Sequence, residues 1–314
     1  MEFLTYYGNA TADTYQFDGL EGGLLADATA KTALSAGGSF YDGGNAAATL
    51  STLDTMIDKA LSYNGSSQDK FVFLASRPMI SRVSALQTRV TRVVNTVRSE
   101  MGFEMETYRT IPLLPTGILT PLSTSTSPTL TGAAAAGGAL AAGTYYFAIS
   151  SVTLNGEQKA SAAASVVTAS SNLTAHLTWT ADSNAKLYKI WRGTTSTVAD
   201  MGLIAVIPAL TYDGNGNLSS TVASYDDTGV TPNTALNPLV STDEQIALVN
   251  ITAGDRGVRY VGGVSPLGEK MDSYFSYVPL STTNGSYRFM MEGFIALRNA
   301  YPECNVIARN VRAA

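Results

Sequence analysis

Histidine and cysteine are almost missing from this sequence of 314 residues, which contains one of each, His176 and Cys304. A zinc site needs several such ligands, so the sequence excludes a zinc site of the usual kind. A single cysteine also excludes a disulfide within the chain, which fits assembly in a reducing cytoplasm. The side chains that most often supply catalytic and metal chemistry are therefore scarce.

The surroundings of these two residues give them no catalytic role. His176 stands between Ala175 and Leu177 in an alternating pattern, which is typical of a strand with one face in solvent. No Gly-x-Ser-x-Gly segment accompanies it. Cys304 belongs to no recognisable catalytic motif, so we expect a buried and unreactive thiol. We predict no catalytic residue and do not expect an enzyme.

Cofactor motifs are missing as well. The glycine pairs near the N-terminus do not form Gly-x-Gly-x-x-Gly between a strand and a helix. Asp213, Asn215, Asn217 and the pair Asp226–Asp227 have oxygen ligands for Ca²⁺, but the twelve-residue loop and its closing glutamate are lacking. Solvated turns are the favoured interpretation. We predict neither a cofactor nor a metal.

Charge is scarce too, since charged residues make up 14% of the chain, against about 25% in an average protein. The net charge of -5 argues against sequence-specific binding to nucleic acid. No apolar run reaches the roughly 20 residues needed to cross a membrane. The first residues lack the basic start and apolar stretch of a signal peptide. We expect no membrane partner.

The residues that are present predict a mixed helix and strand body at residues 1–120 and 240–314. An amphipathic helix is expected from Leu50, with Ser51 as its N-cap, and Phe71–Ala75 has the composition of a buried strand. The second part is expected to contain several strands. A short helix should end near Arg298, and a last strand should follow it from Asn305 to Val311.

A second helix is predicted from Met79 to Val97, where apolar residues recur at helical spacing. Its other side carries arginines and no carboxylate: Arg82, Arg89, Arg92 and Arg98. Guanidinium groups make bidentate contacts with carboxylates, so this side is a candidate subunit interface. A solvated helix surface is an equally weighted alternative.

The composition changes at residues 121–239. Low-complexity stretches at residues 123–128 and 133–143 resemble linkers. Short strand patterns then recur with turn residues between them and no helical pattern, which indicates a separate all-β sandwich. The expected strands are 144–152, 165–169, 175–180, 187–192, 203–207 and 222–225.

Several segments of this middle part resemble a fibronectin type III or immunoglobulin-like domain. They are Gly143–Ile149, Asn155–Glu157, Leu177–Trp179, Tyr188–Arg192 and Tyr225–Gly229. The resemblance implies that Trp179 and Tyr188 lie in the core of the sandwich. Such modules often decorate the surfaces of phage structural proteins.

The flanking parts resemble the major capsid protein of tailed bacteriophages, which has the Hong Kong 97-type fold. The resemblance rests on the helix from Leu50, on Phe71–Ala75 with Ser76–Pro78 and the helix after it, and on the closing runs Ser286–Glu303 and Val306–Val311. It implies an α+β fold with one discontinuous capsid-type body, into which the sandwich is inserted as an outward-facing module. That family begins with an N-terminal arm, an extended loop and a spine helix, whereas this chain starts near the end of that helix.

The resemblance also implies a function. The chain is expected to be a structural subunit of a phage or prophage capsid that acts by self-association, in the virion, after assembly in the bacterial cytoplasm. Its partners would be copies of itself and other virion proteins. The alternative is a module that binds carbohydrate or a host surface through the sandwich. Trp191, Tyr212 and Tyr225 are the candidate surface-binding residues for such glycans.

Overall fold

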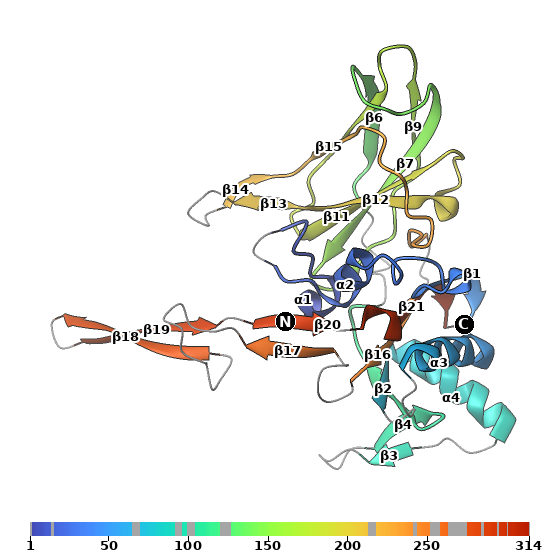
Figure 1. The fold of residues 1–314 in the computed structure, drawn as a ribbon, viewed down its shortest axis with the longest axis vertical. Coiled ribbons are helices and arrows are strands. Elements are labelled where there is room, and N and C mark those ends of the chain that lie inside the picture. The colour runs from blue at the N-terminus through green and yellow to red at the C-terminus, as the bar shows by residue number, and fades with distance from the viewer. Residues whose placement is uncertain are drawn as a thin grey trace.

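The computed structural model describes residues 2–13, 16–64, 70–91, 96–98, 104–119, 127–212, 218–240, 244–251, 258–262, 275–283, 286–293, 295–299 and 301–313. These residues form four α-helices and twenty-one strands, so the fold is mixed and rich in strands. Figure 1 shows a body that contains the α-helices, a part made mainly of strands above it, and a ribbon that extends to one side. No helix in the described ranges is long and apolar enough to cross a membrane.

A seven-stranded mixed sheet forms the centre of the body. Two strands from the end of the sequence lie in it between strands from the beginning, and the pairs β1–β21 and β2–β5 are parallel. In spatial order the strands are β1 (Phe40–Ala47), β21 (Val306–Arg312), β16 (Glu244–Asn250), β2 (Phe71–Ala75), β5 (Ile111–Pro115), β4 (Glu104–Tyr108) and β3 (Thr96–Arg98). The two flanking parts of the sequence therefore share one sheet.

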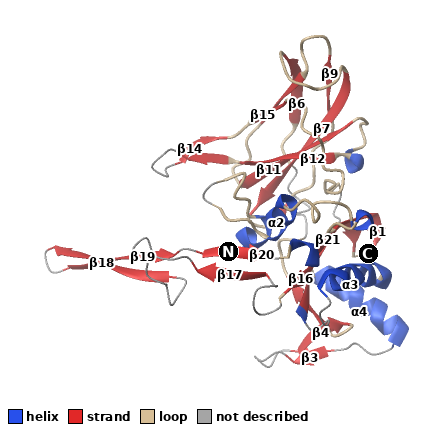
Figure 2. Ribbon diagram, in the orientation of Figure 1, coloured by secondary structure: helices blue, strands red, loops and turns tan. Residues whose placement is uncertain are grey.

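Both faces of this sheet are buried. The helices α3 (Leu50–Asn64) and α4 (Arg77–Thr91) pack on one face, where Ile246 and Leu248 of β16 meet them. Ala247 and Val249 belong to the cluster on the other face, as the period of two in a strand requires. Figure 2 shows both helices beside the body sheet.

The starts and ends of these helices differ in part from expectation. The backbone N–H of Thr52 donates to Thr49 Oγ1 at 3.2 Å, so Thr49, and not Ser51, caps α3. The predicted second helix ends at Thr91, and Thr96–Arg98 is a strand that pairs with β4. The β-branched Thr96 and Val97 favour the extended backbone there. The prediction that Arg98 lies on the helix is therefore wrong.

The glycine-rich N-terminal segment forms two short helices, although glycine is unfavourable within a helix. The helices α1 (Glu2–Tyr7) and α2 (Leu20–Ala26) lie between the body sheet and the strands above it (Figure 1). Their backbones approach closely, because a Cβ atom on Gly22 would lie 2.4 Å from the carbonyl oxygen of Gly8. Glycine is required at this contact and does not indicate a loop.

The middle part of the chain forms two sheets that pack face to face, which we call the sandwich. One sheet has the order β12–β11–β7–β8 with β9 also on β7, and the other has the order β15–β10–β6. The bounds are β6 (Leu130–Ala135), β7 (Gly143–Thr153), β8 (Gly156–Glu157), β9 (Ala164–Thr168), β10 (Thr174–Trp179), β11 (Ala185–Gly193), β12 (Gly202–Pro208) and β15 (Ser224–Asp227). A small pair, β13 (Leu210–Tyr212) with β14 (Leu218–Thr221), follows β12.

The core between these two sheets contains the aromatic pair expected there. Trp179 and Tyr188 are buried, and their ring centroids lie 5.3 Å apart in an edge-to-face arrangement. Five of the six predicted strands of this part are present, and the sixth, expected at residues 222–225, begins only at Ser224 as β15. The strand β6, in contrast, begins between the two stretches that resemble linkers and extends into the second of them.

Two further strand pairs extend away from the body (Figure 1). The pair β17 (Val258–Gly262) with β20 (Ile295–Asn299) continues towards β18 (Phe275–Thr283) with β19 (Ser286–Gly293), and we call this second pair the ribbon. The predicted short helix ending near Arg298 is therefore wrong. Backbone pairing of β20 with β17 fixes that segment as a strand and overrides its local helix propensity.

Candidate functional site

Four charged side chains from distant parts of the sequence meet in the interior, and we call them the ionic cluster. They are Glu21 of α2, Glu157 of β8, Lys189 of β11 and Arg309 of β21, and each side chain is at most 3% exposed. Lys189 Nζ lies 2.5 Å from Glu21 Oε1 and 2.7 Å from Glu157 Oε2. Arg309 Nη2 lies 2.8 Å from Glu157 Oε1. The cluster therefore contains equal numbers of acidic and basic side chains.

Aromatic and amide side chains surround this cluster. Gln245 Nε2 donates to the hydroxyl oxygen of Tyr7 at 2.9 Å, and Gln245 Oε1 accepts from Arg309 Nη1 at 3.2 Å. The guanidinium carbon of Arg309 lies 5.7 Å from the ring centroid of Trp191. Lys189 Nζ lies 5.0 Å from the ring centroid of Tyr7. Both cations thus gain cation–π contacts away from water.

The pKa values follow from this packing. Burial alone would raise the pKa of Glu157, but the charges of Arg309 and Lys189 and their hydrogen bonds lower it to about 2. Burial alone would lower the pKa of Arg309, and Glu157 and Glu21 raise it instead. Burial raises the pKa of Tyr7 well above its usual value, and the charge of Glu157 raises it further. Glu157 and Arg309 are therefore charged in the folded chain, and Tyr7 is neutral.

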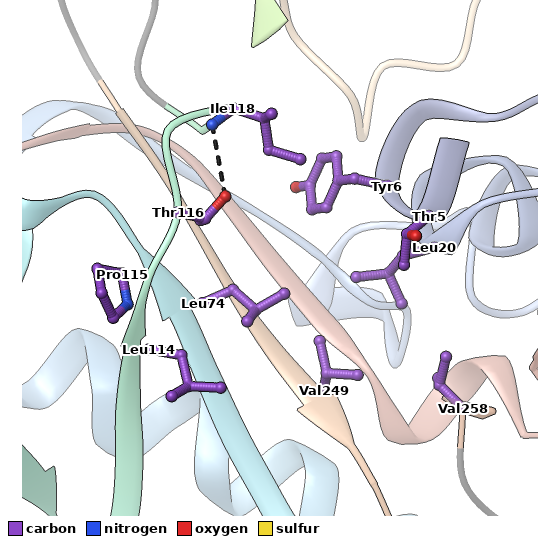
Figure 3. A pocket seen from close by; sticks show the side chains of 10 residues that line it. All are labelled: Thr5, Tyr6, Leu20, Leu74, Leu114, Pro115, Thr116, Ile118, Val249 and Val258. Atoms are coloured by element: carbon purple, nitrogen blue, oxygen red, sulfur yellow. Dashed lines mark hydrogen bonds between the residues drawn. The ribbon is translucent and has the colours of Figure 1, made fainter. Parts of the chain in front are cut away.

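A second feature is an apolar cavity of about 430 Å³ beside α1, on the sheet face that does not carry α3 and α4. Leu74, Leu114 and Val249 contribute from the sheet, and Thr5 and Tyr6 from α1 (Figure 3). The hydroxyl of Thr116 in its wall accepts a hydrogen bond from the Ile118 backbone at 3.4 Å. Because most of the residues that line the cavity are apolar, it is suited to an apolar group.

The four predicted interface arginines are not all on one helix. Arg82 lies on α4, half-buried, and its Nε donates to the backbone oxygen of Ala48 at 3.4 Å. Arg89 also lies on α4, but its side chain is outside the described part, and Arg92 falls wholly outside the described residues. Arg98 is on β3. The interface role of Arg82 and Arg89 stays a prediction.

The predicted surface-binding residues do not form one surface. Trp191 is fully buried, so its assignment to a binding surface is wrong: its ring packs beside Arg309, and its Nε1 donates to Ser150 Oγ at 2.5 Å. Tyr225 is half-buried against the sandwich core, where burial raises its pKa. Tyr212 ends β13, and its side chain is outside the described part.

His176 and Cys304 lie as expected, Asp227 does not, and the other predicted turn residues, Asp213, Asn215 and Asn217, lie outside the described residues. His176 is exposed, and its Nδ1 lies 2.5 Å from Asp226 Oδ1 on the adjacent strand. Cys304 is 2% exposed, which confirms the buried thiol. The predicted solvated turn at Asp227 is wrong, because Asp227 is buried and forms an ion pair with Arg192. Within the described ranges, no group of three or more His, Cys, Asp or Glu side chains is placed to hold a metal ion.

No protein-family model matches this sequence, and no curated protein is significantly similar to it. Among solved structures, the fold is similar to a subunit of the holo-SrpI encapsulin complex from Synechococcus elongatus PCC 7942, with a TM-score of 0.36 and 12% identity. The alignment covers 87% of this chain and 53% of that one, so the chain spans about half the length of the encapsulin subunit. No family assignment follows from a likeness at this level.

Proposed function

We propose that this chain is a structural subunit of a shell that assembles from its own copies. The shell would be of the tailed-phage or prophage capsid type, found in the virion. The sandwich would be an immunoglobulin-like or fibronectin-like module on its surface. The chain would act by packing against neighbouring copies, and no reaction is assigned to it.

The ribbon is the observation that carries this proposal. Its strands β18 and β19 pair with each other and with no other strand of the described residues. Figure 1 shows them standing clear of the body and the sandwich. An isolated two-stranded hairpin is at best marginally stable in water, so such a ribbon needs a surface to lie on. A neighbouring subunit would supply that surface.

The composition of the ribbon supports the same conclusion. Its two strands contain Phe275, Tyr277, Phe289, Met290 and Met291. Aromatic residues and methionine are enriched where one protein surface packs against another. The basic side of α4, with Arg82 and Arg89, is proposed as a second contact, made to carboxylates of a neighbouring copy.

The test is assembly of the full chain, followed by light scattering and negative-stain electron microscopy over a range of concentrations. We expect multimers or closed particles. In the variant Y277K/M291E the two new charges face each other in the register of the ribbon. An opposite-charge pair of this kind supports the hairpin, but it makes the ribbon hydrophilic. We expect this variant to stay monomeric and folded.

A matched control places the same pair of charges on the sandwich. Thr131 and Thr178 are directly opposite each other on β6 and β10, and their hydroxyls lie 2.8 Å apart. We expect T131K/T178E to assemble as the wild type does. A wild-type chain that stays monomeric at every concentration, or a Y277K/M291E variant that assembles normally, would contradict the proposal.

A further inference from the structure

The contact between sandwich and body is built as part of the interior. One cluster of buried residues contains Tyr6 and Leu24 from the N-terminal helices, Trp191 and Leu187 from the sandwich, and Ile307 from the body sheet. Domains joined only by linkers move relative to each other by default, unless a large apolar interface holds them. The ionic cluster lies within this interface.

We propose that the ionic cluster fixes the orientation of the sandwich relative to the body. Burial of apolar surface is not directional, so it holds two parts together without selecting one angle between them. Buried ion pairs are directional, and a buried charge without its partner is strongly unfavourable. Only the observed orientation therefore satisfies all four charges at once.

The four charges of the cluster come from three segments. The sandwich contributes one acid and one base, Glu157 and Lys189, whereas α2 contributes only Glu21 and the body sheet only Arg309. Separation of the body from the other two segments would leave Arg309 without a carboxylate partner. Separation of α2 would leave three charges with a net charge of +1. The sandwich alone keeps the neutral pair Glu157–Lys189, and Glu21 and Arg309 lie 3.6 Å apart outside it. The contacts Lys189–Glu21 and Arg309–Glu157, in contrast, form only when all three segments meet.

Arg309 adds an angular requirement, because all three of its nitrogens have separate acceptors. Nη2 donates to Glu157 Oε1 at 2.8 Å, Nη1 to Gln245 Oε1 at 3.2 Å, and Nε to the backbone oxygen of Asn237 at 3.0 Å. A guanidinium group is planar, so these three directions define its position and its tilt. Glu157 belongs to the sandwich, and Asn237 lies on the connection that returns from it. This inference stands whether or not the chain assembles.

The test measures two properties, which are the orientation of the sandwich relative to the body and the stability of the folded chain. In the full chain with Cys304 replaced by alanine, spin labels are attached through A85C on α4 and N172C on the sandwich, both at exposed positions. The label-to-label distance distribution is measured in this chain and in E21L/E157L/K189M/R309M, which replaces all four charges with apolar side chains. We expect the unfolding midpoint to be kept and the distribution to broaden about twofold or more, because apolar replacements of a buried ionic group are often tolerated.

Two further variants complete this test. R309K keeps the charge but cannot reach the three acceptors together, so we expect its distance distribution to broaden as well. R192M/D227L removes a buried ion pair that lies inside the sandwich, and we expect its distribution to stay narrow. The proposal is overturned if the fourfold variant or R309K keeps the narrow distribution, or if R192M/D227L broadens it equally.

Discussion

At the scale of single residues, the interior of this protein depends on charges that could not be buried alone. Glu157 accepts hydrogen bonds from Lys189 at 2.7 Å and from Arg309 at 2.8 Å, and its side chain has no exposed surface. Transfer of a single carboxylate from water to such a site is very unfavourable. The two cations and the neighbouring amide of Gln245 make the burial tolerable, so each member depends on the others.

Substitution of Glu157 by glutamine removes one negative charge and keeps the size of the side chain. The cluster is then left with a buried net charge of +1. We expect the free energy of unfolding, measured with urea, to fall by about 3–5 kcal/mol. The control is D226N, which removes the exposed partner of His176, and we expect a change of about 1 kcal/mol or less. Similar losses in both variants would contradict this account of the cluster.

The stability of the chain should depend on pH through the same residue. The pKa of Glu157 is about 2 in the folded chain, below the value of about 4.3 in an unfolded chain. As the pH falls, the unfolded state binds the proton first, so the stabilisation is complete above about pH 5 and is lost between about pH 4.3 and pH 2. The loss should be on the order of 3 kcal/mol.

Urea unfolding at a series of pH values measures this dependence. The wild type should lose stability steeply across the acidic window. E157Q has no carboxylate at this position and should decline less steeply over the same range. Parallel curves for the two proteins would show that other groups control the acid sensitivity.

At the scale of elements, the sequence predicted the strands with strong alternation and missed those made of small residues. The strands β7, β10 and β11 carry clear apolar patterns and were predictable. The strand β6 contains Leu130 followed by Thr, Gly and Ala residues, and its composition resembled a linker. Small residues are used there because the strand packs closely, which a pattern of hydrophobicity does not record.

The ionic cluster could not be predicted for a related reason. Lys189 and Glu21 are separated by 168 positions in the sequence, and Arg309 and Glu157 by 152. Lys189 stands alone between Tyr188 and Ile190, whereas Glu157 is followed by Gln158 and Arg309 by Asn310. Such an isolated charge within a strand pattern indicates a buried partner, but it does not identify which residue that partner is.

Gly132 in β6 gives a direct test of this close packing. A Cβ atom at this position would lie 2.5 Å from Val166 Cγ2 and 3.0 Å from Leu177 Cδ2, both in the sandwich core. We expect G132A to lower the free energy of unfolding by about 1–3 kcal/mol through overpacking. The matched control is G117A, where a Cβ atom meets nothing within 4 Å, and we expect it to be neutral or slightly stabilising. If G132A leaves the free energy of unfolding unchanged, the core adapts to the added methyl group and the expected overpacking is contradicted.

At the scale of the whole molecule, three parts of the sequence contribute to one continuous interior. The body sheet is made of strands from both ends of the chain, and the N-terminal helices fill the space between this sheet and the sandwich. The ribbon stands outside that interior (Figure 1). A subunit of this shape would be rigid where the ionic cluster joins its parts and would depend on a neighbour at the ribbon.

If the ribbon is completed by a neighbour, association must stabilise the folded chain by mass action. A partner that binds only the folded state adds stability that grows with concentration, by about 2.7 kcal/mol at about a hundredfold excess over its dissociation constant. We therefore expect the thermal unfolding midpoint of the wild type to rise with protein concentration in scanning calorimetry. In Y277K/M291E the midpoint should be independent of concentration and equal to that of the dilute wild type. A concentration-independent midpoint in the wild type would mean that the ribbon is stable without a second copy, and the shell proposal would then lose its main support.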